Sequence, residues 1–211
     1  MRKEYKKQVK AVWQKYRAAV LLWFALGTLI YVAVTVVGNL TAPPSLSLVT
    51  VNLRLSQAGS EYLRQSFDAH TDTEQLLIAE AELEPFETRK DLGTNYYALQ
   101  ALLSLHAGQE LDILLMDQAA MENLLRQDIC LDLRKLFSEE ELLFLAGSSV
   151  WGRHRDESEA RPLVLDVTDL PFIRNNTDCG GKVYLAITDN TSQLQACRIF
   201  WEVMSAWEAS K

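Results

Sequence analysis

Residues that could bind a small polar molecule follow the predicted strands of this 211-residue chain. Leu46–Leu55 is rich in apolar and β-branched residues and predicts a strand, and Leu111–Met116 predicts a second strand that is buried on both faces. In open α/β sheets, ligands bind outside the carboxyl ends of the parallel strands. The candidate ligand-binding residues at these ends, and in a further short strand, are Ser56, Gln57, Ser60, Asp117, Gln118 and Trp151.

Each of these residues also has a purely structural interpretation. Ser56 or Ser60 could be the N-cap of the helix predicted at Glu61–Ala69, and Asp117 could cap the helix that follows it. Trp151 could pack against the core or a linker and contact no ligand. Both interpretations stay open from the sequence alone.

Catalytic and metal-binding patterns are absent from the sequence. It contains none of the phosphate-binding, dinucleotide-binding, zinc-protease or nucleophile-elbow motifs. The three histidines, His70, His106 and His154, are far apart, and arginines interleave the acidic residues after His154. We therefore expect no enzyme activity, no cofactor and no metal site.

Three cysteines, Cys130, Cys179 and Cys197, allow at most one internal disulfide. Cys179 and Cys197 lie on either side of a predicted strand and could pair. The alternative is that all three are small buried thiols.

The uncharged stretch at residues 18–40 is long enough to cross a membrane as a helix. About 20 mainly apolar residues span the hydrocarbon core of a bilayer, and this segment is longer than the apolar region of a cleaved signal peptide. The sequence therefore predicts a basic segment at 1–17, a transmembrane signal-anchor at 18–40, a linker at 41–45 and one domain at 46–211.

Charge is distributed unevenly between these regions. Residues 1–17 hold seven of the 21 Lys and Arg residues but one of the 28 acidic residues. By the positive-inside rule, this pattern predicts a single-pass cell-membrane protein with a cytoplasmic N-terminus and an extracytoplasmic domain. The acidic domain repels phosphates, which argues against a nucleic-acid partner.

Strands and helices alternate along the predicted domain. Expected helices at 61–69, 95–107, 119–126 and 196–207 separate expected strands at 46–55, 74–83, 111–116, 163–167 and 183–187. Ser138–Glu141 and Ser192–Gln195 have the spacing of capping boxes. This alternation predicts an α/β fold with a mainly parallel sheet covered by helices.

The run from Tyr96 to Phe137 resembles the extracellular solute-binding proteins of bacterial ABC importers. It has a helix, the strand LDILLM, the acidic residue Asp117, another helix and then Leu131-Asp132-Leu133. Val183–Trp207 is similar to the late strand and helix by which such chains return to their first lobe. Family members have two lobes, whereas this chain has the length for one, so the resemblance implies a single lobe of periplasmic-binding-protein-like fold.

The function that this resemblance implies is the binding of a small polar solute and its presentation to a membrane transporter. The alternative is a non-enzymatic docking module that has lost its ligand and contacts a membrane partner, such as a transporter or sensor, or another copy of itself.

Overall fold

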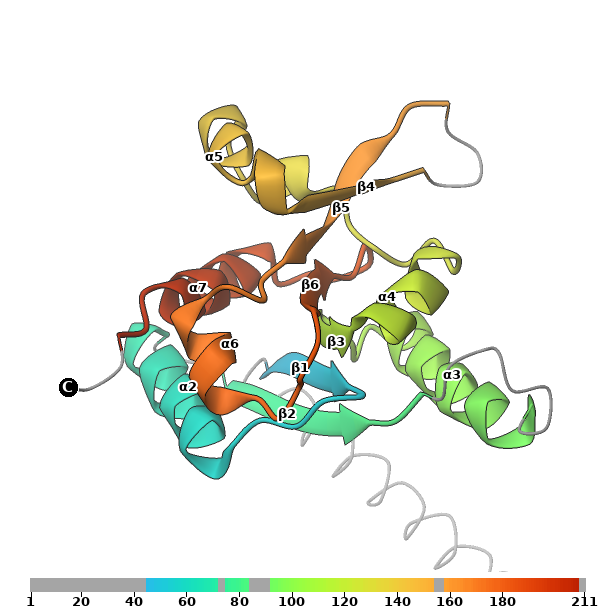
Figure 1. The fold of residues 1–211 in the computed structure, drawn as a ribbon, viewed down its shortest axis with the longest axis horizontal. Coiled ribbons are helices and arrows are strands. Elements are labelled where there is room, and N and C mark those ends of the chain that lie inside the picture. Colours follow the sequence, from blue (N-terminus) through green and yellow to red (C-terminus); the bar gives the residue numbers. More distant parts are fainter. Residues whose placement is uncertain (1–44, 72–74, 84–91, 154–157, 209–211) are drawn as a thin grey trace, which may run out of the picture. The chain divides into compact units, whose positions relative to one another are not determined.

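The computed structural model describes residues 45–71, 75–83, 92–153 and 158–208, which belong to one compact unit at 44–211 (Figure 1). The side chains of residues 92–96 are not described. The predicted basic segment at 1–17, the anchor at 18–40 and nearly all of the linker lie outside the described residues. The predicted fold included a transmembrane helix, but none of the helices in the described part of the chain is long and apolar enough to cross a membrane.

The domain alternates strands and helices along most of its length. In chain order the elements are β1 Ser45–Val51, α2 Gln57–His70, β2 Gln75–Ala81, α3 Leu92–Ala107, β3 Ile113–Asp117, α4 Gln118–Leu125, η1 Leu133–Lys135, α5 Glu139–Phe144, η2 Ala146–Ser148, β4 Ser149–Gly152, β5 Arg161–Asp166, α6 Pro171–Asn176, β6 Val183–Ile187 and α7 Leu194–Ser205. The α/β class is confirmed.

The prediction of a mainly parallel sheet is wrong, because the sheet is mixed. Its strand order is β2-β1-β3-β6-β5-β4. β1 is parallel to both β2 and β3, whereas the β3–β6, β6–β5 and β5–β4 pairs are antiparallel.

The lengths of the helices within the connections explain this change of direction. A parallel crossover must carry the chain back along the whole sheet, and this takes a dozen or more residues, usually a full helix. α2 and α3 are long enough to do so before β2 and β3. The six-residue helix α6 rises only about 9 Å, so β6 starts at the edge where β5 ends and runs the opposite way.

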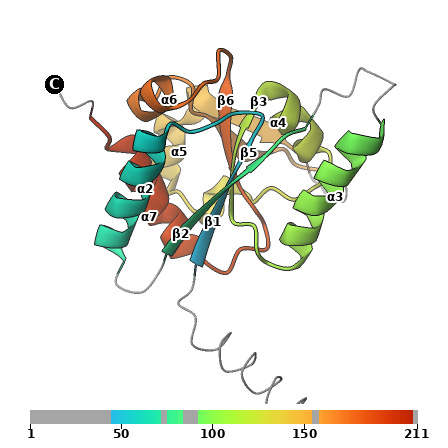
Figure 2. The same ribbon diagram turned by 90° about the horizontal axis from the view of Figure 1, so that it is seen from below.

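Helices cover both faces of the sheet. Figure 2 shows α2, α6 and α7 on one side of the strands and α3 and α4 on the other. Successive side chains of a strand point to opposite faces, and β3 and β6 follow this period. Ile113 and Leu115 face α2 and α7, and Leu114 and Met116 face α3 and α4.

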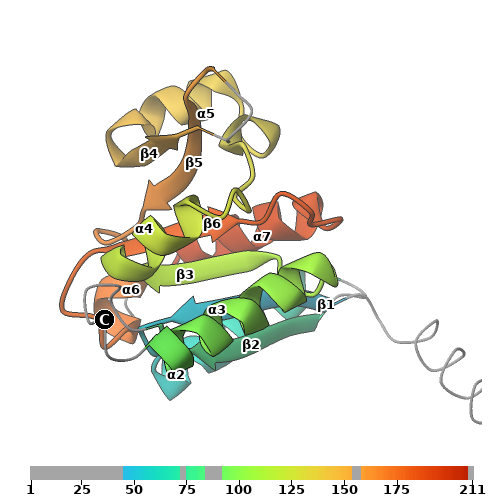
Figure 3. The ribbon, with the colours of Figure 1, turned by 90° about the vertical axis from the view of Figure 1, so that its right-hand side faces the viewer.

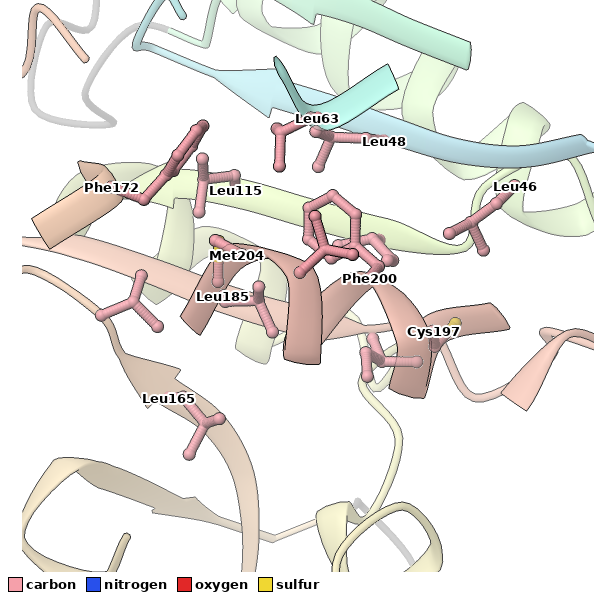
Figure 4. Packing of buried hydrophobic residues seen from close by; sticks show 14 of the residues in the cluster. Leu46, Leu48, Leu63, Leu115, Leu165, Phe172, Leu185, Cys197, Phe200 and Met204 are labelled. Carbon is pink, nitrogen blue, oxygen red and sulfur yellow. The ribbon is translucent and has the colours of Figure 1, made fainter. Parts of the chain in front are cut away.

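Two hydrophobic clusters result, one on each face. The first cluster packs beneath α2 and α7, and Figure 4 shows part of it, including Leu46, Leu48, Leu63, Leu115, Phe172, Leu185, Phe200 and Met204. The second cluster packs beneath α3 and α4 and includes Val49, Val51, Leu102, Leu114, Met116, Leu124 and Ala186.

The helix starts agree with the predicted capping signals at α5 but not at α7. Ser138 and Glu141 form the predicted capping box at the start of α5. The capping box predicted at Ser192 is wrong, because α7 begins after Gln193, which makes no side-chain cap. α6 was not predicted from the sequence; Pro171 occupies its first position, where a missing N–H is tolerated.

Candidate functional site

The three parallel strands β2, β1 and β3 end together at one edge of the sheet. Their register aligns Val51 with both Ala81 and Met116, so the residues that follow these three positions meet at the same level. The arrowheads of β1 and β2 in Figure 1 mark this edge. It is the edge at which ligands bind in open α/β sheets.

Asn52, directly after β1, joins the ends of the three strands. Its backbone has φ 60°, in the left-handed region that asparagine tolerates better than most residues. Its N–H donates to the carbonyl oxygen of Ala81 at 3.0 Å, and its side-chain oxygen accepts from the N–H of Leu83. Its Nδ2 donates to Asp117 Oδ1 at 3.1 Å.

Asp117 also begins α4. The same Oδ1 accepts a hydrogen bond from the N–H of Ala120 at 2.8 Å, which makes Asp117 the N-cap of the helix. The capping interpretation of Asp117 is therefore confirmed. Capping does not remove it from the edge, because Asp117 lines a cavity there.

Arg54 brings the remaining charged groups to this edge. Its guanidinium pairs with Glu82 at 3.1 Å and approaches Glu80 at 3.6 Å. The backbone N–H of Arg54 donates to Asp178 Oδ1 at 2.7 Å, and the backbone N–H of Asp178 donates back to the Arg54 carbonyl oxygen. The segment after β1, the end of β2 and the loop before β6 are thus held together.

These residues enclose a cavity of about 660 Å³ that opens to solvent. Small-molecule sites are clefts of about 300–1,000 Å³, so this volume suits a small solute. Leu53 and Leu83, which are both buried, form apolar parts of its wall. The polar groups of the lining are Asn52, Arg54, Glu80, Glu82, Asp117 and Asp178. Four carboxylates and one guanidinium give the cavity a negative balance.

The three predicted residues at the start of α2 have structural partners and do not line the cavity. Ser56 Oγ accepts from the N–H of Gly59 at 3.0 Å and donates to Asn176 Oδ1 at 3.1 Å, which makes Ser56 the N-cap of α2. Gln57 donates to Glu61 along the helix surface. The N–H of Ser60 donates to the Ser56 carbonyl oxygen within the first turn.

Gln118 and Trp151 are also outside the cavity. Gln118 Nε2 donates to Glu122 one turn along α4. Trp151 lies on β4, at the far edge of the sheet from β2, and is 58% exposed. The structure therefore does not bring Trp151 together with Asp117.

The disulfide considered between Cys179 and Cys197 is not formed, since all three cysteines are in the thiol form. Cys197 is buried within the first cluster, whereas Cys179 lies half-buried in the loop before β6. Burial, together with the nearby Asp189 and Asp128, raises the pKa of Cys130 to about 12, so this thiol stays protonated at neutral pH.

The sequence prediction missed most of the cavity because it extended the first strand too far. β1 ends at Val51 and not at Leu55, so the residues that follow it are Asn52 and Arg54 and not Ser56. The available signal was Asn52, a residue that tolerates positive φ, directly after Val51, with Arg54 two positions further on. Nothing local in the sequence indicates that Asp178 reaches Arg54 across the fold.

The fold and cavity define an α/β domain with a mixed sheet and a polar cavity beside its parallel strands. No protein-family model matches the chain, and no curated protein is significantly similar to it. The resemblance to solute-binding proteins therefore stays a prediction from the sequence. Within the described residues, no group of three or more His, Cys, Asp or Glu side chains is placed to hold a metal ion.

Proposed function

We propose that this domain is a non-enzymatic binding module for a small polar solute that carries a positive charge. The observation that carries the proposal is the cavity of about 660 Å³ at the carboxyl edge of β2, β1 and β3. Its position follows the rule for ligand sites in open α/β sheets, and Asp117 was expected there from the sequence.

The charge of the solute is inferred from the lining. Glu80, Glu82, Asp117 and Asp178 outnumber the single cation, Arg54. An amine or guanidinium group on the solute would pair with these carboxylates, whereas an oxyanion would be repelled. The side chains of Glu80 and Glu82 are mostly exposed, so salt should weaken this attraction.

The late elements of the chain support the proposed relation to solute-binding proteins. β6 returns to pair with β3 in the middle of the sheet, and α7 then packs beside α2. This is the path that the resemblance implies for the final strand and helix. In the proposed role, the partner that receives the solute is a membrane transporter.

A thermal-unfolding screen of the full chain tests the proposal. The solutes are basic amino acids and polyamines, compared with neutral sugars, neutral amino acids, short peptides and oxyanions. A solute that binds only the folded state at a hundredfold excess over its Kd stabilises by about 2.7 kcal/mol. We expect the midpoint to rise with a cationic solute, and less so at high salt.

Two matched variants locate the binding site. Glu82→Gln removes a carboxylate from the cavity and should weaken binding of the cationic solute several-fold. Glu122→Gln removes an exposed carboxylate on α4 that does not line the cavity, and should leave binding unchanged. A flat screen, or a response to oxyanions alone, would contradict the proposal.

A further inference from the structure

Large exposed hydrophobic residues are concentrated in one short segment of the described chain. We call residues Glu139–Arg153, which contain α5, η2 and β4, the edge segment. Three of its residues, Leu143 (77% exposed), Phe144 (91%) and Trp151 (58%), are among the exposed large hydrophobics of the described residues. Figures 1 and 3 show α5 and β4 standing apart from the helices that cover the middle of the sheet.

The inner side of the edge segment is fixed to the domain. Glu141 pairs with Arg198 of α7, and the Arg198 guanidinium lies 5.3 Å from the centre of the Phe137 ring. Leu142 and Leu145 pack against the first cluster. These contacts hold α5 in place against the domain, so its exposed residues belong to an anchored helix.

The outer side of α5 combines acidic and apolar residues. Glu140, Leu143 and Phe144 have the i, i+3, i+4 spacing that places side chains on one helix face, and all three are exposed, as is Glu139. Neither Glu139 nor Glu140 makes an ion pair with another described residue. A partner that buries this face must supply basic groups, because the carboxylates of Glu139 and Glu140 would otherwise lose water without gaining an opposite charge.

β4 provides an unpaired strand edge next to this face. It is the last strand in the order β2-β1-β3-β6-β5-β4, so among the described strands it pairs with β5 alone. An exposed strand edge carries unpaired N–H and C=O groups that can pair with a further strand. Arg153, which directly follows β4, is exposed and adds a positive charge at this end of the segment.

The edge segment is therefore complementary to itself. Its acidic groups precede the apolar residues in the chain and its basic group follows them. A two-fold interface presents the same surface twice, so self-complementarity of this kind is what it requires. Antiparallel pairing of β4 with its copy would bring Arg153 of each copy toward α5 of the other, because only the three residues of η2, with Leu145, separate α5 from β4.

We infer that two copies of this chain associate through their edge segments, with β4 pairing antiparallel to β4 across a two-fold axis. Leu143, Phe144 and Trp151 form the apolar centre, and Arg153 of each copy faces Glu139 and Glu140 of the other. β2, the outermost strand on the other side of the sheet, is the weaker candidate for a dimer interface because Leu77 is its single exposed large hydrophobic residue. This inference does not depend on the proposed solute site.

Sedimentation equilibrium of the purified full chain tests the inference, in a density-matched non-ionic detergent that covers the apolar stretch at 18–40. We expect a monomer–dimer equilibrium. Trp151→Glu should weaken dimerisation about thirtyfold, as for a residue at the centre of an interface. Leu77→Glu on β2 is the matched control and should have no effect. Both side chains are exposed, and thermal unfolding checks that the variants remain folded.

A charge-swap series tests the orientation of the two copies. Arg153→Glu alone, or Glu139→Lys with Glu140→Lys, should weaken the dimer about tenfold by placing like charges opposite one another. Combining all three substitutions should restore it. A monomer at every concentration overturns the inference, as do higher oligomers, equal sensitivity to Leu77→Glu and Trp151→Glu, or failure of the combined variant to recover.

Discussion

Asn52 links the ends of β1, β2 and β3 while its own backbone lies in the left-handed region. Asn52→Ala should destabilise the fold by about 2–3 kcal/mol, because it leaves the N–H of buried Leu83 without its acceptor and retains an unfavourable φ. Asn52→Gly loses the same hydrogen bonds without the backbone strain. We expect it to be about 0.5–1 kcal/mol more stable than Asn52→Ala in urea unfolding. Equal stability of the two variants would mean that the strain is negligible.

Glu141 makes the stability of the protein depend on pH in acid. Its hydrogen bond from Arg198, followed by those from Ser138, lowers its pKa from 4.5 to about 2. Because the pKa is lower in the folded state, the stabilisation is fully present above about pH 4.5 and is lost as the pH falls toward 2. The Tm difference between wild type and Glu141→Gln should therefore shrink between pH 6 and pH 3.

Glu140→Gln is the control for this titration, measured in dilute protein. Glu140 is on the same helix, but it has no ion pair with the described residues, so its effect on Tm should change little over this range. A Tm difference for Glu141→Gln that stays constant with pH would contradict the assigned role of the Arg198 pair.

Individual residues of the site were predictable only where neighbouring residues in the sequence indicate their role. Asp117 follows a short, uniformly apolar strand, and its capping role and its place at the sheet edge could both be inferred from the sequence. Arg54 and Asp178 could not be connected in this way. They are 124 positions apart in the chain, and they meet because β6 enters the sheet beside β3.

At the scale of elements, α2 and α6 approach closely at Gly59. A Cβ atom at Gly59 would lie 2.7 Å from the Cβ of Asn176, which is buried and cannot move aside easily. Gly59→Ala should therefore destabilise the fold by about 1–2 kcal/mol, although alanine favours helices. Gly147→Ala in η2 meets no atom within 4 Å and should change stability by less than about 0.5 kcal/mol. Urea unfolding of both variants distinguishes this contact from a general intolerance of alanine.

The positions of the strands were more predictable than their directions. Val183–Ile187 was predicted with its observed bounds, and the strand predicted at 74–83 is present as β2 at Gln75–Ala81. Direction depends on the connections. The parallel sheet was inferred from the alternation of strands and helices, and α6, which is too short for a parallel crossover, was not predicted.

At the scale of the whole molecule, both hydrophobic clusters depend on the same strands. Adjacent residues of β1, β3 and β6 supply opposite clusters, so neither cluster can come apart while the sheet stays intact. The described domain should therefore unfold as one cooperative unit.

Leu63→Ala in the first cluster and Leu124→Ala in the second should each destabilise it by about 2–5 kcal/mol, because both side chains are fully buried. Calorimetry of the full chain should show one transition for the domain in each variant, with equal calorimetric and van't Hoff enthalpies. Leu77→Ala, at an exposed position, should leave this transition almost unchanged. A separate early transition in either core variant would show that the two faces of the sheet are stabilised independently.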